Sequence, residues 1–398
     1  MSEVATREPQ LRFPEFSDSL IKGALGDYAL IKRGAGSQYI EYSKDSKDSI
    51  RLIRIGDFLG GDAVFVRLTN AIQRFLLDEG DILIAGTGAT AGITFLVPTK
   101  FVGMAYSYNA PKIKVHKDNV SFFYQYLISP KIKIQQIRLF TGNAQPFLDT
   151  NAIKGFSIFK PPLQEQQKIA AFLTAVDNKI EQLSKKQALL GEYKKGLMQQ
   201  IFSQAIRFKS DDGGTFPDWE EKNGNEIFDN ISNKNHDSDL PILAITQEHG
   251  AIPRDLINYK MIVSDKSVSS YKVVETGDFI ISLRSFQGGI EYSNYKGICS
   301  PAYIILRPAI EIEKKFYKYY LKTYRYIQDL NRKLEGIRDG KMVSYKYFSE
   351  IKLPYPSISE QAKIANFLSS IDNKIEQVGK QLRESKQFKK ALLQQMFV

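Results

Sequence analysis

The chain has 398 residues, 43% hydrophobic and 25% charged, the composition of a soluble globular protein with room for two or three domains. Its net charge of +11 and pI of about 9.3 favour a polyanionic partner, nucleic acid first and an anionic membrane surface second. No apolar run approaches the ~18 residues of a membrane span, the N-terminus has no apolar signal core, and Cys299 is the only cysteine. These features predict no membrane span, no export, no intrachain disulfide and a cytoplasmic location.

A β-rich globular region is predicted at the start of the chain. Short runs between Gly and Asn/Asp breaks, such as residues 50–55 and 63–68, are typical of strands. Residues 80–84 (GDILI) predict another strand, followed by a glycine-bearing loop at 86–90. That loop superficially resembles a dinucleotide-binding loop, which should open a helix; residues 93–97 read as a strand instead, so a β-hairpin is favoured.

Each globular region continues into an aromatic-rich helical segment. The first covers residues 122–140, with a break near Pro130, and the second covers residues 316–334. Clustered Tyr and Phe rings could stack on bases. Core packing is the favoured interpretation, because aromatics at helical spacing are usually buried.

Two long helices are the organising elements of the chain. Residues 165–202 and 360–397 are identical at about 20 of 38 positions, at a constant offset of 195 residues and without a gap. Such a match is an internal repeat. A proline break precedes each copy, so we expect the helices to begin at Gln164 and Ser359, with a glutamate in each first turn, where negative charge suits the helix dipole.

The apolar positions of the two helices predict that they pair with each other. They recur at steps of four and three, the spacing of a coiled-coil seam, interrupted at Gln187, Lys194, Ser385 and Lys389. Polar seam residues weaken such a pair and fix its register. About 38 residues at ~1.5 Å each make a rod of roughly 57 Å. An ordinary bundle helix is the alternative, which the repeat disfavours. The predicted pairing residues are Ile169, Leu173, Val176, Ile180, Leu183, Ile364, Leu368, Ile371, Ile375 and Val378.

The repeat covers globular regions as well as helices. Residues 11–13 (LRF) match residues 206–208 (IRF) at the offset of 195, and residues 277–281 (GDFII) match the strand at 80–84. The loops that follow these strands differ in sequence, as expected when one scaffold reads two targets. The predicted division is a globular domain at 1–160, a helix at 161–205, a second domain at 206–355 and a second helix at 356–398.

No catalytic or metal site is predicted. His116, His236 and His249 are scattered without metal-ligand spacing, and no P-loop lysine motif is present. Residues 217–222 (PDWEEK) hold the residue types of a metal-dependent nuclease, but too close together to come from separate strands. Residues 161–162 share two prolines with the tetrapeptide of DNA adenine methyltransferases, without its polar and aromatic flanks.

This order of elements resembles the specificity subunit of a type I restriction-modification enzyme. The resemblance covers nearly the whole chain and rests on the strands at 80–84 and 277–281 and on two proline-to-helix junctions, KPPLQEQQKIA at 160–170 and LPYPSISEQAKIA at 353–365. The second junction departs from the tight double proline, which bears on how that helix is aimed. The implied fold is α+β: two α/β target recognition domains in tandem pseudo-repeat, separated by two long helices forming an antiparallel intramolecular coiled coil.

The resemblance also implies a function. Each recognition domain reads one half of a bipartite sequence in double-stranded DNA, and the helices set the spacing and dock two methyltransferase (M) subunits. The M subunits carry S-adenosylmethionine and methylate adenine, and restriction/translocase (R) subunits use ATP and Mg. The chain itself is then non-catalytic and holds no cofactor. A rod of roughly 57 Å is long enough for half-sites ~34 Å apart.

Loops matched in position but not in sequence are the predicted DNA contacts, at 86–90, 142–145, 284–287 and 338–344. Their Arg, Gln, Asn and Thr side chains suit base edges or phosphates, and plain surface loops are the alternative. The candidate residues are Arg33, Ser37, Tyr39, Gly86, Thr87, Gly88, Thr90, Asn143, Gln145, Arg254, Arg284, Ser285, Gln287, Arg338, Lys341 and Ser344.

Two other functions are considered. A coiled-coil adaptor without DNA specificity would explain the helices, but neither the pI nor the paired variable loops. An enzyme in its own right is the weaker alternative, because no catalytic motif supports it.

Overall fold

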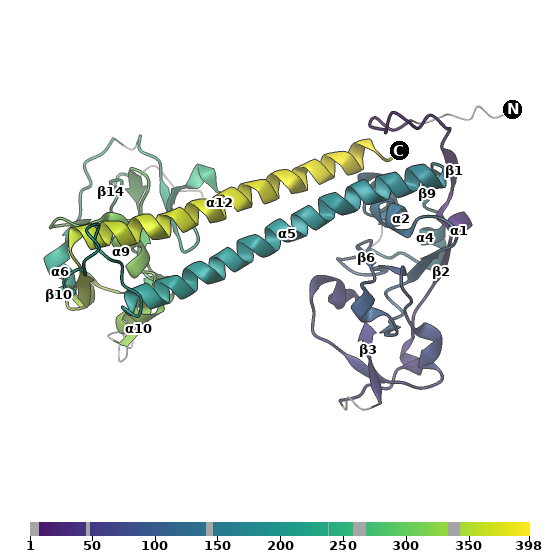
Figure 1. Cartoon of the computed structure of the whole chain (residues 1–398), viewed down its shortest axis with the longest axis horizontal. Helices are drawn as coiled ribbons and strands as arrows, with labels where there is room; N and C mark the ends of the chain where they lie inside the picture. Colours follow the sequence, from purple (N-terminus) through teal and green to yellow (C-terminus); the bar gives the residue numbers. More distant parts are fainter. Residues whose placement is uncertain (1–7, 45–47, 141–145, 238, 258–267, 333–342) are drawn as a thin grey trace. The chain divides into compact units, whose positions relative to one another are not determined.

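The computed structural model describes residues 8–44, 48–140, 146–237, 239–257, 268–332 and 343–398. The chain forms two compact units, Met1–Ser184 with Lys380–Val398, and Lys185–Gly379 (Figure 1). We call them the first and the second unit. Each unit contains part of both long helices, so the predicted four-part division of the chain stays a prediction.

A four-stranded antiparallel sheet lies at the centre of the first unit. Its order is β2 (Ala29–Lys32), β8 (Lys112–Val115), β5 (Ile82–Ile84) and β6 (Thr94–Leu96). All three residues of β5 are buried, as in a central strand, whereas alternate residues of the outer strand β2 are exposed. The pairing of β5 with β6 confirms the predicted hairpin, so the intervening glycines do not open a helix.

The aspartate of each Gly-Asp strand motif is a buried anchor. Asp81, fully buried, accepts from the backbone N–H of Asp78 at 2.7 Å and pairs with Lys112 of β8 at 2.9 Å. In the second unit, Asp278 makes the same turn bond at 2.8 Å and pairs with Arg307 at 2.7 Å. The motif therefore fixes the turn before the central strand and ties it to the neighbouring strand.

The first unit also contains a smaller sheet. It consists of β4 (Phe65–Arg67), β3 (Ser49–Ile53) and β7 (Ala105–Tyr106), with short 3-10 helices η1 (Ser37–Tyr39), η2 (Ile55–Leu59), η3 (Ile72–Phe75) and η4 (Thr99–Phe101). Its β3 and β4 lie between β2 and β5 in the chain, and its β7 follows β6. The predicted strand at 50–55 ends at Ile53, because the chain turns into η2 there.

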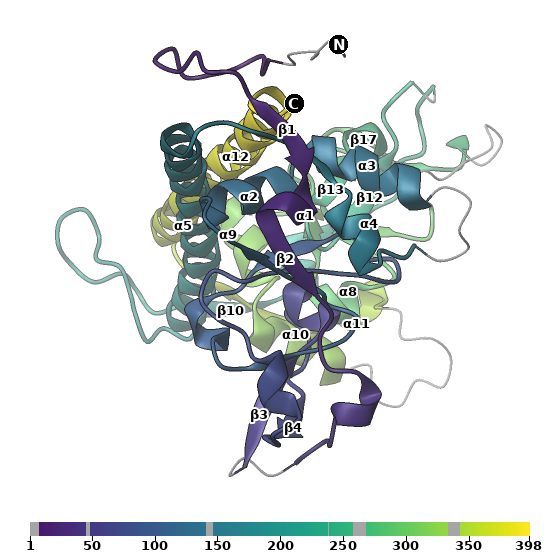
Figure 2. The same cartoon turned by 90° about the vertical axis from the view of Figure 1, so that its right-hand side faces the viewer.

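The remaining elements of the first unit surround the central sheet. β1 (Ile21–Ala24) pairs antiparallel with β9 (Ser157–Lys160) and leads into α1 (Leu25–Tyr28) and β2, as Figure 2 shows. The helices α2 (Val120–Leu127), α3 (Pro130–Phe140) and α4 (Thr150–Lys154) follow. Pro130 is the first residue of α3, where its missing N–H costs nothing, so the predicted break near Pro130 is confirmed.

The second unit repeats this plan. Its four-stranded sheet has the same order, β11 (Phe228–Ile231), β18 (Ile304–Pro308), β15 (Phe279–Ile281) and β16 (Glu291–Tyr292). Three strand pairs accompany it: β10 (Glu220–Asn223) with β19 (Lys352–Tyr355), β12 (Leu243–Thr246) with β13 (Gly250–Pro253), and β14 (Lys272–Val274) with β17 (Gly297–Cys299). Its short helices are α6 (Gly224–Ile227), η5 (Arg254–Leu256), α8 (Ser285–Gly288) and α11 (Tyr345–Ser349).

The predicted aromatic helix at 316–334 is two helices, which corrects the sequence interpretation. α9 (Lys314–Tyr320) ends before α10 (Tyr324–Arg332) begins, and the hydroxyl of Thr323 accepts from the backbone N–H of Tyr326 at 3.3 Å. A threonine that caps a new helix explains the break. Phe316, Tyr317 and Tyr326 are fully buried, which supports core packing over base stacking.

The long helices are α5 (Leu163–Phe202) and α12 (Ile358–Gln395), each starting one residue before the predicted position. In the first unit, Leu173 near the start of α5 shares a buried core with Leu392 near the end of α12. In the second unit, Phe202 at the end of α5 shares a core with Ile364 near the start of α12. The helices therefore pack antiparallel (Figure 1). None of the helices in the described segments is long and apolar enough to cross a membrane.

Candidate nucleic-acid interface

Several loops of the first unit meet around Arg33, which follows β2. Its guanidinium carbon lies 4.4 Å from the ring centroid of Tyr108 and 5.5 Å from that of Phe147. Thr87, in the predicted loop after β5, forms an isolated β-bridge with Phe147. Both rings are 45% exposed. A guanidinium held against two exposed rings can stack on a base or bind a phosphate.

Gly34 makes this arrangement possible. A Cβ at Gly34 would lie 2.3 Å from the carbonyl oxygen of Tyr106 and 2.5 Å from that of Ser107. The next residue, Ala35, donates its N–H to the Tyr106 carbonyl at 2.8 Å. Only glycine allows the two backbones to approach this closely, so Gly34 fixes Arg33 beside Tyr108.

The other first-unit candidates are more dispersed. The N–H of Gly86, which is buried, donates to Asn109, and Thr87, Gly88 and Thr90 are half-buried. Ser37 is exposed on η1, whereas the Tyr39 ring packs 5.4 Å from that of Phe75. Asn143 and Gln145 lie outside the described residues. The structure thus brings Arg33 and Thr87 together and leaves Ser37 and Tyr39 with the smaller sheet.

In the second unit, Arg284 and Gln287 are the exposed candidates. Arg284 precedes α8, in the loop after β15, which is the position of the first unit's loop after β5. The carbonyl of Phe286 in α8 accepts from the side-chain amide of Asn331 at 2.9 Å, which anchors α8 to α10. Arg284 is therefore an exposed cation on an anchored turn, able to contact a phosphate or a guanine edge.

Two second-unit candidates have structural roles. Ser285 is 2% exposed and its hydroxyl accepts from the Ser282 N–H at 2.8 Å, so its burial argues against direct contact with DNA. Ser344 caps α11 through a bond from the N–H of Tyr347 at 3.3 Å. Arg254 is half-buried at the start of η5. Arg338 and Lys341 lie outside the described residues.

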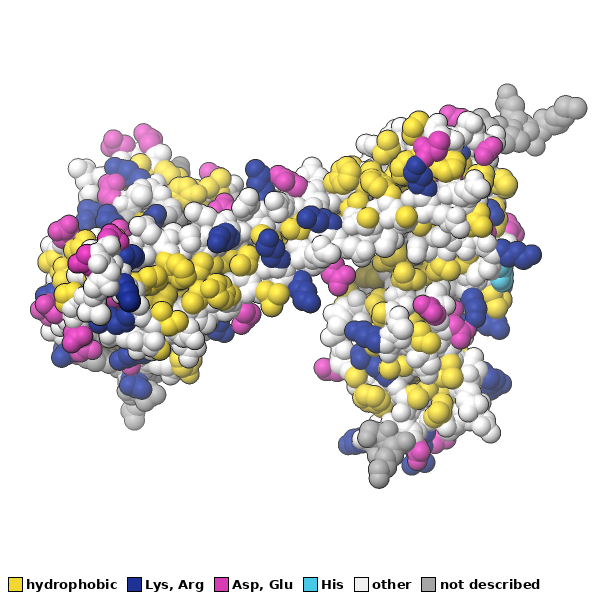
Figure 3. All heavy atoms as spheres, in the orientation of Figure 1, with side chains coloured by type: hydrophobic (Ala, Val, Ile, Leu, Met, Phe, Trp, Pro, Cys, Tyr) yellow, Lys and Arg dark blue, Asp and Glu magenta, His cyan; other side chains and the backbone are white. Residues whose placement is uncertain are grey.

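Basic residues are spread over both units. On the face shown in Figure 3, Lys and Arg side chains are interspersed with Asp and Glu. The excess positive charge of +11 therefore favours polyanion binding through the summed field, while the loops must supply any sequence preference.

The glutamate in the first turn of each long helix is buried and paired. Glu165, 1% exposed, accepts from Nε of Arg12 at 2.8 Å and from Nη2 at 2.7 Å. Glu360, fully buried, accepts from the same atoms of Arg207 at 3.3 and 2.9 Å. The bonds with these carboxylates raise the pKa of both arginines. The LRF and IRF markers of the repeat thus supply the arginine that lets each glutamate be buried.

The next residue of each junction ties the helix to its unit. The side-chain amide of Gln166 donates to the Pro161 carbonyl at 2.9 Å, and its oxygen accepts from the Asn119 N–H at 3.0 Å. Gln361 does the same with Pro356 at 2.8 Å and with the N–H of residue 313 at 2.9 Å. The Glu-Gln pair in each junction therefore holds the start of the long helix against its own unit.

The polar seam residues Lys194 and Lys389 form ion pairs across the helices. In the first unit Lys389 pairs with Asp177, whose carboxylate also accepts from Gln125 at 2.7 Å. In the second unit Lys194 pairs with Asp372 at 2.6 Å, and that carboxylate accepts from the Tyr319 hydroxyl at 2.7 Å. Each network joins both long helices to an aromatic helix of the same unit.

Most predicted pairing residues lie on the buried faces of the helices. Val176, Ile180 and Ile375 are half-buried, and the others are at most 5% exposed. The buried ones are Ile169, Leu173, Leu183, Ile364, Leu368, Ile371 and Val378.

Sequence reasoning missed Tyr108 and Phe147. Both lie in stretches without regular periodicity, and only the fold places them beside Arg33. An aromatic next to a proline, as in Pro146-Phe147, is the one signal that the sequence offers. Among the residues that the structure describes, no group of three or more His, Cys, Asp or Glu side chains could hold a metal ion.

The fold and these surfaces define a class of protein. Its members contain a tandem duplication of a loop-bearing domain together with two paired long helices, and the loops differ between the two copies. The family model described as the type I restriction modification DNA specificity domain matches residues 24–190 and again residues 217–384. Because the matches span most of the chain, it belongs to this family.

The relatives found by sequence are named as specificity subunits, and the solved structures share the fold of this chain. The MjaVIII specificity subunit of a type I restriction enzyme from Methanocaldococcus jannaschii is 27% identical over 83% of this chain and 80% of its own length. The putative MjaX specificity subunit from the same organism is 26% identical, over 81% and 78%. The type I S subunit of M. genitalium matches with a TM-score of 0.59 at 17% identity, over 98% and 99% of the two chains.

A chain from a structural study of type I restriction-modification complex assembly matches with a TM-score of 0.56 at 20% identity, over 94% and 96% of the two chains. The protein is a specificity subunit of a type I restriction-modification system, with two recognition domains and no catalytic role of its own. The adaptor alternative is not favoured, because the family match covers both globular regions as well as the helices.

Proposed function

We propose that the first unit reads one half of a bipartite DNA target through Arg33 and the loop at 86–90, and that the second reads the other half through Arg284 and Gln287. One observation supports this proposal most directly. The four-stranded sheets of the two units have the same strand order, but the loops after β5 and β15 differ in sequence. Arg284 lies in the loop after β15, whereas the loop after β5 is glycine-rich. Guanidinium groups suit guanine edges and phosphates, which supports this assignment.

The partners in this proposal are double-stranded DNA, two methyltransferase (M) subunits and restriction/translocase (R) subunits. The duplicated fold supports two copies of one methyltransferase, because each repeat contains the same junction between recognition domain and long helix. S-adenosylmethionine, ATP and Mg are assigned to those subunits, and this chain uses no cofactor. The buried free thiol of Cys299 fits a reducing cytoplasm.

Charge reversal at Arg284 tests the DNA contact. Arg284→Glu should weaken binding of the wild-type target by about tenfold or more, as expected for losing a charge-assisted contact and adding repulsion. Lys315→Glu, an exposed charge reversal on α9, is the control and should change affinity much less. Fluorescence anisotropy at fixed salt measures both. An unaltered affinity together with an unaltered methylated sequence in Arg284→Glu would exclude this residue as a contact.

A further inference from the structure

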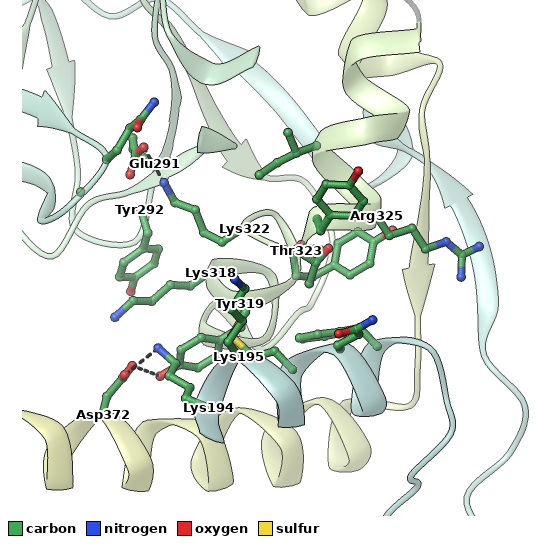
Figure 4. A pocket seen from close by; sticks show the side chains of 18 of the residues that line it. Lys194, Lys195, Glu291, Tyr292, Lys318, Tyr319, Lys322, Thr323, Arg325 and Asp372 are labelled. Atoms are coloured by element: carbon green, nitrogen blue, oxygen red, sulfur yellow. Dashed lines mark hydrogen bonds and ion pairs between the residues drawn. The ribbon is translucent and has the colours of Figure 1, made fainter. Parts of the chain in front are cut away.

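The second unit contains a cavity of about 940 Å³ beside α5. Met198 and Phe202 of α5 line it, together with α9, the start of α10 and the turn between β12 and β13 (Figure 4). Glu291 and Tyr292 of β16, Asn294, and Asp372 of α12 also line it. This volume lies within the range of small-molecule sites, roughly 300–1,000 Å³.

Three cations that line the cavity have no ion pair within the described residues: Lys195 and Arg325, which are exposed, and Lys318, which is half-buried. Lys194 is paired with Asp372, and Lys322 with Glu291. Lys318 forms no ion pair within 4.0 Å with a carboxylate of the described residues, although the charge of Asp372 acts on it from further away. Its Nζ lies near the rings of Tyr292, at 5.6 Å, and Tyr319, at 5.7 Å. Burial lowers the pKa of Lys318, as expected of a desolvated ammonium. An anion in the cavity would supply the missing charge.

The cavity also presents a buried acceptor without a donor. Glu291 is 2% exposed, and only one of its carboxylate oxygens, Oε1, accepts from Lys322. The other, Oε2, is buried and has no partner in the described part of the chain. A buried carboxylate oxygen left unpaired is costly, so a ligand with a hydrogen-bond donor is the complement of this atom.

The first unit has no equivalent of these charges. By helix position, Lys318 and Lys322 correspond to Tyr124 and Ile128. By strand register, Glu291, opposite Ile280, corresponds to Phe95, opposite Leu83. The first unit therefore keeps the ion pair equivalent to Lys194–Asp372, which is Lys389–Asp177, and lacks the charges of Lys318, Lys322 and Glu291. A partner that binds both units alike would not require this difference, so the cavity fits a ligand that only the second unit takes.

We propose that this cavity binds a nucleoside monophosphate, with the phosphate at Lys318, the planar base along the rings of Tyr319 and Phe202, and a donor group of the nucleotide at Oε2 of Glu291. A nucleotide is the chemistry that joins an anion, a flat ring and a donor within one small molecule. The inference goes beyond DNA sequence reading, because Arg284 does not line the cavity, although Lys322 of the lining donates to the Gly288 carbonyl at the end of α8 at 3.0 Å.

Calorimetric titration of the purified full chain with AMP, GMP, CMP or UMP tests the proposal. At least one should bind saturably, and more tightly than inorganic phosphate, because the rings add to the affinity. Lys318→Met should weaken that binding by about tenfold or more. Lys315→Met, an exposed lysine of the same helix outside the cavity, should leave it within about twofold. Lys318→Gln provides a second variant if the methionine variant does not fold.

Three results would overturn the proposal: no saturable binding of any of the four nucleotides, phosphate binding as tight as the best nucleotide, or the same affinity in Lys318→Met as in wild type. A duplex DNA arm identifies the source of the nucleotide. Competition between DNA and the bound nucleotide would assign the cavity to a nucleotide of the strand, and independent binding would assign it to the free pool.

Discussion

At the residue scale, Arg33 shows what the sequence could and could not predict. Its charge and its position after a strand made it a candidate, but its setting between Tyr108 and Phe147 depends on contacts across roughly 75 and 114 residues of chain. No local pattern predicts such contacts. Ser285 is the opposite case, a polar loop residue that the fold buries because it caps its own turn.

Cys299 gives a residue-scale prediction on pH. Burial raises the pKa of its thiol to about 12, from an ordinary value of 9.0. The thiol therefore stays protonated near pH 8, and we expect negligible maleimide labelling of the folded chain over an hour. Urea-unfolded chain is the control and should label fully. Intact-mass spectrometry measures both, and rapid stoichiometric labelling of the folded chain would contradict the buried placement.

The same shift has a consequence for stability. Because the pKa of Cys299 is raised in the folded state, the folded chain holds the proton more tightly than the unfolded chain. This contribution to stability is complete below about pH 9 and is lost as the pH rises toward 12.

At the element scale, the long helices were predictable and their partners were not. The steps of four and three located the buried stripe, including the polar interruptions at Lys194 and Lys389. That each lysine meets an aspartate of the other helix follows from the antiparallel register, which periodicity alone does not supply. The prediction of one aromatic helix at 316–334 was wrong, because Thr323 caps a second helix there.

The ion pair of Lys194 with Asp372 gives a prediction for the helix pair. Asp372→Ala leaves Lys194 half-buried without a counter-charge and removes the acceptor of the Tyr319 hydroxyl. We expect a loss of about 1–3 kcal/mol in the free energy of unfolding of the second unit. The double variant Lys194→Leu/Asp372→Leu should be less destabilised, because no unpaired charge remains. Urea unfolding followed by circular dichroism measures both, and equal losses would mean that the pair is uncoupled.

Gly34 gives a second element-scale prediction. Gly34→Ala places a methyl group 2.3 Å from a backbone carbonyl, so β2 and β7 must separate. We expect a loss of about 1–3 kcal/mol, with weaker DNA binding because Arg33 moves. Gly191→Ala is the matched control: its Cβ meets nothing within 4 Å on α5, so it should stabilise the helix by about 0.5–1 kcal/mol. A Gly34→Ala chain as stable as Gly191→Ala would contradict the close approach.

At the scale of the whole molecule, the internal repeat was the most informative signal. The two long helices keep about half of their residues identical, and the structure shows that the matched positions carry the same bonds, such as Arg12 to Glu165 and Arg207 to Glu360. The loops and the charged cavity of the second unit could not be predicted by matching the copies, because they are where the copies differ.

The central claim is that each unit reads its own half of one bipartite DNA target, and methylation mapping tests it most directly. The chain is expressed with its methyltransferase subunit in a host lacking other adenine methylation, as wild type, Arg33→Ala and Arg284→Ala. Single-molecule sequencing then locates methylated adenines. We expect a bipartite motif for wild type, relaxed in one half by Arg33→Ala and in the other half by Arg284→Ala. A single continuous motif, or relaxation of the same half by both variants, would contradict the account.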